Sequence, residues 1–172
     1  MKPSNRRLPA ILIVLAVLVL ASLACSLADV NLKSGSARIT VTLNENEINR
    51  MIAHSDNTVN DPDLAIKEIT GVELNQGFIR IIGKYDKPDG SEAIGSYDVA
   101  LSAENGELKA EITGVDIEGM DLNDERVQRM NTDVAEALDR SARESHGEVE
   151  YESVVISDSA LTIVVETNWK EQ

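Results

Sequence analysis

The chain is poor in cysteine, in aromatic residues and in basic residues. One cysteine among 172 residues excludes a disulfide framework and a cysteine-based zinc cluster. The chain has 16 basic and 30 acidic side chains, so its net charge is −14. This argues against nucleic acid as a partner, because phosphate contacts need clustered basic residues. Aromatic residues make up 3% of the chain, which leaves few platforms for sugar rings. The length fits one domain rather than two.

The first charged residues are basic and precede a long apolar run. Lys2, Arg6 and Arg7 are followed by an uncharged segment from Leu8 to Ala24, and the first acidic residue is Asp29. A basic start, an apolar stretch and a small residue before a cleavage site are typical of a secretory signal peptide. The sequence therefore predicts that the rest of the chain lies outside the cytoplasmic membrane.

The single cysteine lies at the end of this run. Ser22-Leu23-Ala24-Cys25 resembles a bacterial lipobox, in which a signal peptidase cuts before a cysteine that carries diacylglycerol. Cleavage would remove residues 1–24 and three basic side chains, which changes the net charge from −14 to −17. An uncleaved transmembrane helix and plain secretion are the alternatives, since the apolar run can just span a bilayer. We expect a protein of the bacterial cell envelope, lipid-anchored at Cys25 or held by its uncleaved N-terminal helix.

The residues after the cysteine divide into a linker and a body. Residues 25–36, which end in Lys33-Ser34-Gly35-Ser36, are predicted to form a flexible tether. Residues 37–172 are predicted to form a single domain. Because an acidic protein is repelled by an anionic leaflet, we expect this domain to stand off the membrane surface.

Alternating apolar and polar residues predict strands joined by short turns. Asn75-Gln76-Gly77 and Asn105-Gly106 are typical hairpin turns. The absence of a β-α-β rhythm predicts an antiparallel sheet and an α+β fold. The predicted strands are Ala37 to Leu43, Leu64 to Leu74, Phe78 to Tyr85, Ala93 to Ala103, Leu108 to Ile117, Val149 to Ile156 and Leu161 to Thr167.

Two amphipathic helices are predicted to pack on a curved sheet of about six to seven strands, or to be wrapped by it. Asn44 and Glu47 form a capping box for a short helix that ends near His54. A longer helix begins after Asn123 or Asp124. The apolar faces of the two helices are candidates for lining an apolar groove. The residues concerned are Ile48, Met51, Ile52, Val127, Met130, Val134 and Leu138.

The sequence carries no pattern that is typical of a catalytic or metal site. His54 and His146 are the only histidines and lie at predicted helix ends. Gly-x-Ser-x-Gly, His-Glu-x-x-His and glycine-rich phosphate motifs are missing. Acidic stretches at Asp56 to Asp63 and Asp116 to Asp124 offer oxygen ligands for calcium, but neither has EF-hand spacing. We therefore predict no enzyme activity, no cofactor and no metal site.

The order of the predicted elements resembles that of bacterial envelope proteins of the YpmS-like and LmeA-like kind. Ile39 to Asn49 resembles their opening strand and helix. Val115 to Met120, before a long helix, and a closing hairpin at Val154 to Val164 are similar too. The resemblance covers Ala37 to Thr167. It implies a curved antiparallel sheet around a helix, related in shape to tubular lipid-binding domains, in an anchored or exported protein that binds or moves lipids.

Two functions follow from these features. The first is a membrane-anchored extracytoplasmic lipoprotein that binds a lipid or another apolar ligand, because apolar pockets with few polar groups are typical ligand sites. The alternative is a ligand-free interaction module that docks another envelope protein through a sheet edge or a helix face. The sequence leaves open whether the space between sheet and helix is filled or hollow.

Overall fold

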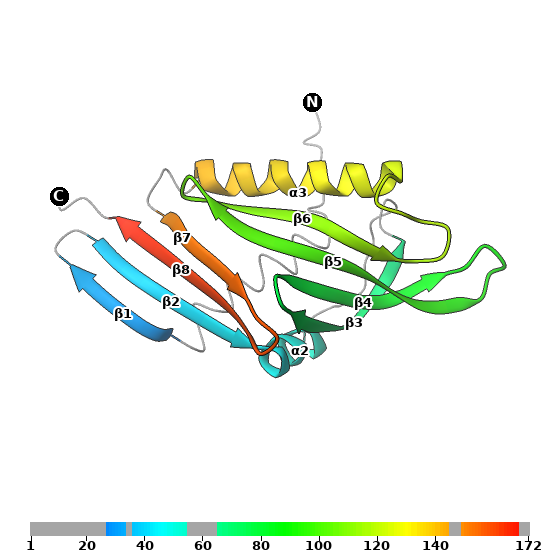
Figure 1. The fold of residues 1–172 in the computed structure, drawn as a ribbon, viewed down its shortest axis with the longest axis horizontal. Coiled ribbons are helices and arrows are strands. Elements are labelled where there is room, and N and C mark those ends of the chain that lie inside the picture. The colour runs from blue at the N-terminus through cyan, green and yellow to red at the C-terminus, as the bar shows by residue number, and fades with distance from the viewer. Residues whose placement is uncertain (1–26, 34–35, 55–64, 145–148, 169–172) are drawn as a thin grey trace, which may run out of the picture.

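The computed structural model describes residues 27–33, 36–54, 65–144 and 149–168 (Figure 1). This part of the chain contains eight strands and two helices. The elements are β1 (Leu27–Lys33), β2 (Ser36–Asn44), α2 (Glu45–Ala53), β3 (Ile66–Asn75), β4 (Phe78–Asp86), β5 (Glu92–Glu104), β6 (Glu107–Asp116), α3 (Glu125–Glu144), β7 (Val149–Ile156) and β8 (Ala160–Asn168).

The strands form two antiparallel sheets. Sheet A has the order β1-β2-β8-β7, and sheet B has the order β3-β4-β5-β6. The predicted α+β class with antiparallel strands is confirmed, whereas the prediction of one continuous sheet is wrong. Sheet A forms because β2 pairs with β8, so that Val41 lies opposite Ile163. Alternation within a strand shows that it is a strand but does not show its distant partner.

The predicted flexible tether over residues 25–36 is also wrong where the structure describes it. Leu27–Lys33 forms β1, which pairs with β2 as an antiparallel hairpin. Lys33 lies opposite Ser36, so only two residues connect the strands. A short segment that contains glycine is typical of a hairpin as well as of a linker, and the pairing of β1 with β2 shows the hairpin arrangement.

The two sheets meet where the turns of sheet B reach β7. The backbone N–H of Gly77, in the β3–β4 turn, donates to the Ile156 carbonyl at 3.0 Å. The backbone N–H of Tyr151 donates to the carbonyl of Gly106, in the β5–β6 turn, at 2.9 Å. Asn105 and Gly106 both have positive φ, as the predicted Asn-Gly turn requires. The turns therefore bond the outer edge of β7, which is otherwise a template for pairing with another chain.

Both helices begin as their sequences predict. The side chain of Asn44 accepts from the Glu47 N–H at 3.0 Å, and the Glu47 carboxylate accepts from the Asn44 N–H at 2.9 Å. Asp124 precedes α3, and its carboxylate accepts from the Arg126 N–H at 2.9 Å.

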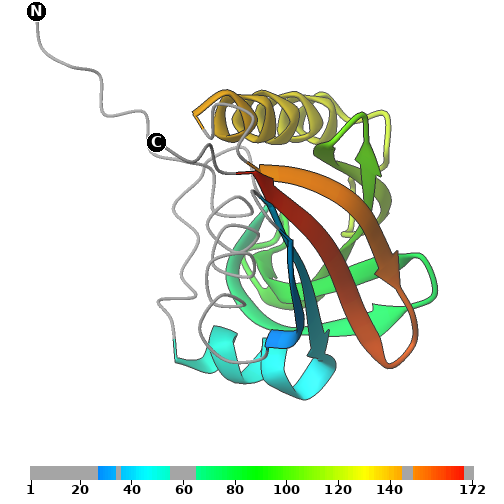
Figure 2. The same cartoon turned by 90° about the vertical axis from the view of Figure 1, so that its left-hand side faces the viewer.

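The two helices pack against different strands: α2 packs against β2 and β3, and α3 packs against β6. Figures 1 and 2 show the two helices on opposite sides of the molecule.

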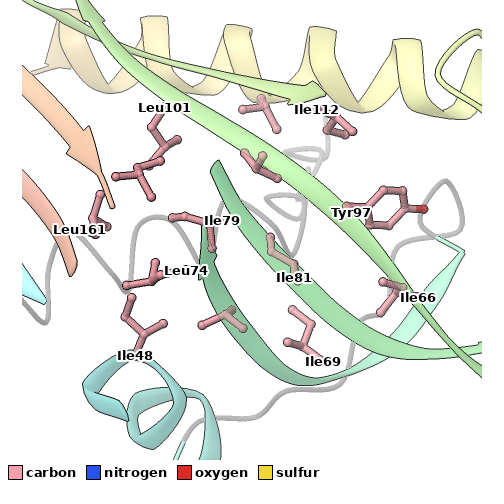
Figure 3. Close-up of a cluster of buried hydrophobic side chains, with 14 of the residues drawn as sticks. Ile48, Ile66, Ile69, Leu74, Ile79, Ile81, Tyr97, Leu101, Ile112 and Leu161 are labelled. Atoms are coloured by element: carbon pink, nitrogen blue, oxygen red, sulfur yellow. The ribbon is translucent and has the colours of Figure 1, made fainter. Parts of the chain in front are cut away.

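The core is almost entirely aliphatic and draws on both sheets and both helices. Tyr97, Ile48, Leu161 and Val127 have less than 2% of their surface exposed. Figure 3 shows Ile48 from α2, Leu161 from β8 and side chains of sheet B gathered in one cluster. Full burial of a side chain of this size contributes about 1.5–3 kcal/mol, so this cluster is the main stabilising element of the domain.

Candidate functional site

The residues predicted to line an apolar groove lie in the core or against it. Ile48 and Ile52 on α2, and Val127, Met130 and Val134 on α3, are buried. Met51 and Leu138 are partly buried against the same cluster. In this conformation a ligand can therefore reach only Met51 and Leu138 without opening the core. Since the helices lie on opposite sides of the molecule, they do not form the two walls of a single groove.

A more accessible apolar surface lies on one face of sheet A. At one end of the sheet, Leu43 on β2, Leu161 on β8 and Ile156 on β7 lie opposite one another and are buried. Two residues away from Leu43 on β2, Val41 is still buried, and so is Ile163, which lies opposite it on β8. This face of sheet A is therefore buried at the end that contacts α2.

The next apolar residues along this face are half-buried. Ile39, Val165 and Tyr151 lie opposite one another on β2, β8 and β7, and Val154 lies next to them opposite Ile163. We call these four residues the apolar strip. All four pack against the core cluster on one side, while part of each side chain remains accessible. The strip therefore joins four neighbouring side chains that a ligand can contact without unfolding of the domain.

A β-bulge in β7 sets the composition of the strip. Tyr151 pairs with Val165, and Ser153 pairs with Val164, so Glu152 has no opposing residue. The extra residue brings Tyr151 and Val154 to the same face although they are three positions apart. Simple alternation would have grouped Tyr151 with Val155, which is 57% exposed on the other face. The sequence prediction of β7 as a regular strand therefore missed the strip.

The bulge also keeps the charged side chains of Glu152 and Arg38 apart from the strip. Glu152 forms an ion pair with Arg38 on β2 at 2.5 Å. On the same sheet, the hydroxyls of Thr42 and Thr162 lie 3.3 Å apart. Partial burial raises the pKa of the Tyr151 phenol, because its surroundings disfavour the charged form. The apolar strip is therefore an uncharged surface.

Two of the hollows in the part of the chain that the structure describes lie near α3. The first, of about 460 Å³, lies beside α3 and the β5–β6 hairpin and is lined by Glu104, Lys109 and Glu111 among others. The second, of about 520 Å³, lies at the loop before α3, which contains Asp121 and Asp124. Charged side chains contribute to the lining of both hollows, whereas the apolar strip contains none.

The carboxylates of this loop already have hydrogen-bond donors. Asp121 accepts from the Asn123 N–H at 2.7 Å, and Asp124 accepts from the Arg126 guanidinium at 2.7 Å. The hydrogen bonds from Arg126 lower the pKa of Asp124 to about 2. Among the described residues no group of three or more His, Cys, Asp or Glu side chains could hold a metal ion. The other acidic stretch, at Asp56 to Asp63, lies outside the described residues.

The remaining candidate residues act within the fold or lie outside the described residues. The ring of His54 hydrogen-bonds to the Arg50 carbonyl through Nδ1 at 2.7 Å, at the end of α2. The hydroxyl of Tyr97 donates to Met120 Sδ at 3.4 Å, and burial raises the pKa of Tyr97 to about 12. Cys25 and His146 lie outside the described residues.

A comparison with protein-family models, with curated proteins and with solved structures finds no match to this chain. Within the described residues, neither α2 nor α3 combines the length and apolar character that a membrane-crossing helix needs.

Proposed function

We propose that this protein is anchored to the outer side of a bacterial cytoplasmic membrane by its N-terminus and that its domain binds a lipid acyl chain. Acylation of Cys25 after signal cleavage provides the anchor, with an uncleaved N-terminal helix as the alternative. The observation that carries the ligand proposal is the half-buried apolar strip, formed by Ile39, Val154, Val165 and Tyr151.

The shape of the accessible surface favours a chain over a compact ligand. The strip crosses three strands and continues directly into the buried residues Val41 and Ile163. Each CH₂ group that moves from water onto such a surface gains up to about 0.8 kcal/mol, so several methylene groups give a useful affinity. Since the strip is uncharged, a hydrocarbon chain can bind there without leaving a charged side chain desolvated.

The structure offers a matched pair of variants that tests the ligand site. Val165→Asp places a carboxylate in the strip, whereas Val155→Asp places one on the exposed face of the same hairpin. We expect native mass spectrometry of protein from its own host to detect a co-purifying lipid with the natural sequence and with Val155→Asp, and a lipid-free protein with Val165→Asp. If Val165→Asp fails to fold by circular dichroism, Val165→Thr replaces it.

Two results would contradict the proposal. A natural protein that carries no lipid and does not bind a fluorescent fatty acid has no acyl-chain site. Equal lipid occupancy in the two folded variants would place the ligand elsewhere on the molecule. The alternative of docking through a sheet edge is less favoured at β3, β6 and β7, because these strands already have hydrogen-bond partners at their outer edges, at Val72, Ile112 and Tyr151. β1 is the remaining edge strand.

A further inference from the structure

The first described strand begins almost at the proposed membrane boundary. β1 starts at Leu27, whereas an acylated Cys25 or an apolar helix over Leu8 to Ala24 would leave the membrane just before it. Two residues of extended chain span about 7 Å. Both anchors therefore hold the start of β1 close to the lipid head groups, and the expected stand-off of the domain is replaced by close approach.

The start of β1 lies at the end of sheet A that carries α2. Leu27 pairs with Val41, and β2 continues from there into α2 at Glu45. β8 begins opposite the same end of β2, since Ala160 pairs with Asn44. Figures 1 and 2 show the start of β1 and α2 at one side of the molecule and α3 at the other.

We propose that α2 and the β7–β8 turn, residues 157–159, form the membrane-facing surface of the domain, so that α3 faces away from the membrane. The partner is the head-group layer of the membrane that holds the anchor. This inference rests on the proposed anchorage of the N-terminus, and it applies equally to an acylated Cys25 and to an uncleaved helix.

The side chains at this surface suit contact with head groups rather than insertion into hydrocarbon. Asn46, Arg50 and His54 are exposed on α2, and Asp158 is exposed in the turn. Ile48 and Ile52 of α2 are buried in the core, so the helix cannot turn these two residues toward lipid. Glu45 and Glu47 add negative charge, which is screened beyond about 8 Å at physiological ionic strength. A zwitterionic membrane therefore tests the geometry without long-range repulsion.

The full-length protein allows a direct test, because Cys25 is its only cysteine: acylation would consume that thiol, and Cys25→Ser removes it where the helix is uncleaved. Asn46→Cys on α2 and Thr132→Cys on α3 introduce thiols at two exposed helix positions. Each variant is labelled with a fluorophore and reconstituted into phosphatidylcholine vesicles that contain a nitroxide head-group lipid. We expect several-fold stronger quenching at position 46 than at position 132.

A linker variant provides the matched control. A flexible insert of about twelve Gly and Ser residues between Ser26 and Leu27 spans roughly 20 Å and should remove most of the difference between the two positions. Equal quenching at both positions without the insert, or stronger quenching at position 132, would overturn the orientation while the anchor stands. Protein that fails to float with the vesicles would overturn the anchor itself and the orientation with it.

Discussion

The side-chain amide of Asn49 bonds to the backbone of Val72 as a neighbouring strand would. Its Nδ2 donates to the Val72 carbonyl at 2.9 Å, and its Oδ1 accepts from the Val72 N–H at 2.7 Å. Glu45 extends this pairing by accepting from the Leu74 N–H at 3.1 Å. At the other edge of sheet B, Asn131 on α3 accepts from the Ile112 N–H at 2.9 Å. Helix side chains thus bond backbone groups at both sheet edges, which limits pairing with other chains.

Asn49→Ala should lower the stability of the domain clearly, because both backbone groups of Val72 lose their partner in a partly buried position. Each unsatisfied group costs about 1–3 kcal/mol. The measurement is urea unfolding followed by circular dichroism. Asn46→Ala on the exposed side of the same helix is the control and should change the free energy of unfolding by less than about 0.5 kcal/mol. A similar loss in both variants would contradict the strand-like role of Asn49.

Ile48→Ala should cost about 2–5 kcal/mol, because the side chain is fully buried and its removal leaves a cavity. Met51→Ala, on the same helix but only partly buried, should cost clearly less. The same urea titration measures both variants. An equal decrease in the free energy of unfolding in both variants would contradict the difference in burial between Ile48 and Met51.

Asp124→Asn should change how the stability of the folded domain depends on pH. Hydrogen bonds from the side chain and backbone of Arg126 lower the pKa of Asp124 in the folded protein to about 2. The carboxylate therefore stabilises the fold above its usual pKa, and this contribution is lost as the pH falls toward 2. We expect the variant to melt at a lower temperature at pH 7 and to show a shallower decline in melting temperature between pH 4 and pH 2.

The exposed residue Asp158, changed to Asn, is the control for this pH series. Its melting curve should follow that of the natural protein across the whole range. A variant at Asp124 that keeps the full acid dependence would show that the start of α3 does not depend on this carboxylate.

Cys25→Ala should abolish fatty-acid labelling of the protein in a bacterial host and leave a precursor that is not cleaved. The reason is that lipoprotein signal peptidase acts on a chain whose cysteine has been acylated. Metabolic labelling with a clickable fatty acid and the mobility of the protein on a gel measure the two effects. Labelling that persists in the variant would assign the lipid to another residue.

Local features of the fold were predicted correctly from the sequence. The capping box of Asn44 and Glu47 and the Asn105-Gly106 turn depend on residues a few positions apart, and both are present. The helix after Asp124 also begins where its charged first turn indicates. Such features are predictable because the interacting groups are neighbours in the chain.

Features that depend on distant partners could not be predicted in this way. The pairing of β2 with β8 brings Thr42 next to Thr162, and no local pattern indicates that contact. The bulge at Glu152 changes which residues share a face, although the sequence alternates. The role of Asn49 depends on where Val72 lies after folding, so an asparagine within a helix carries no signal of it. The apolar strip was missed for these reasons.

Sheet A joins the two ends of the described chain, since β2 lies between β1 and β8. The β1–β2 hairpin can form early, but its second edge has no partner until the last strand is available. For a chain that emerges on the outer side of a membrane with its N-terminus first, Leu43 and Val41 would remain uncovered until translocation of the whole chain is complete. The closing of sheet A is therefore expected to be one of the last steps in the folding of the domain.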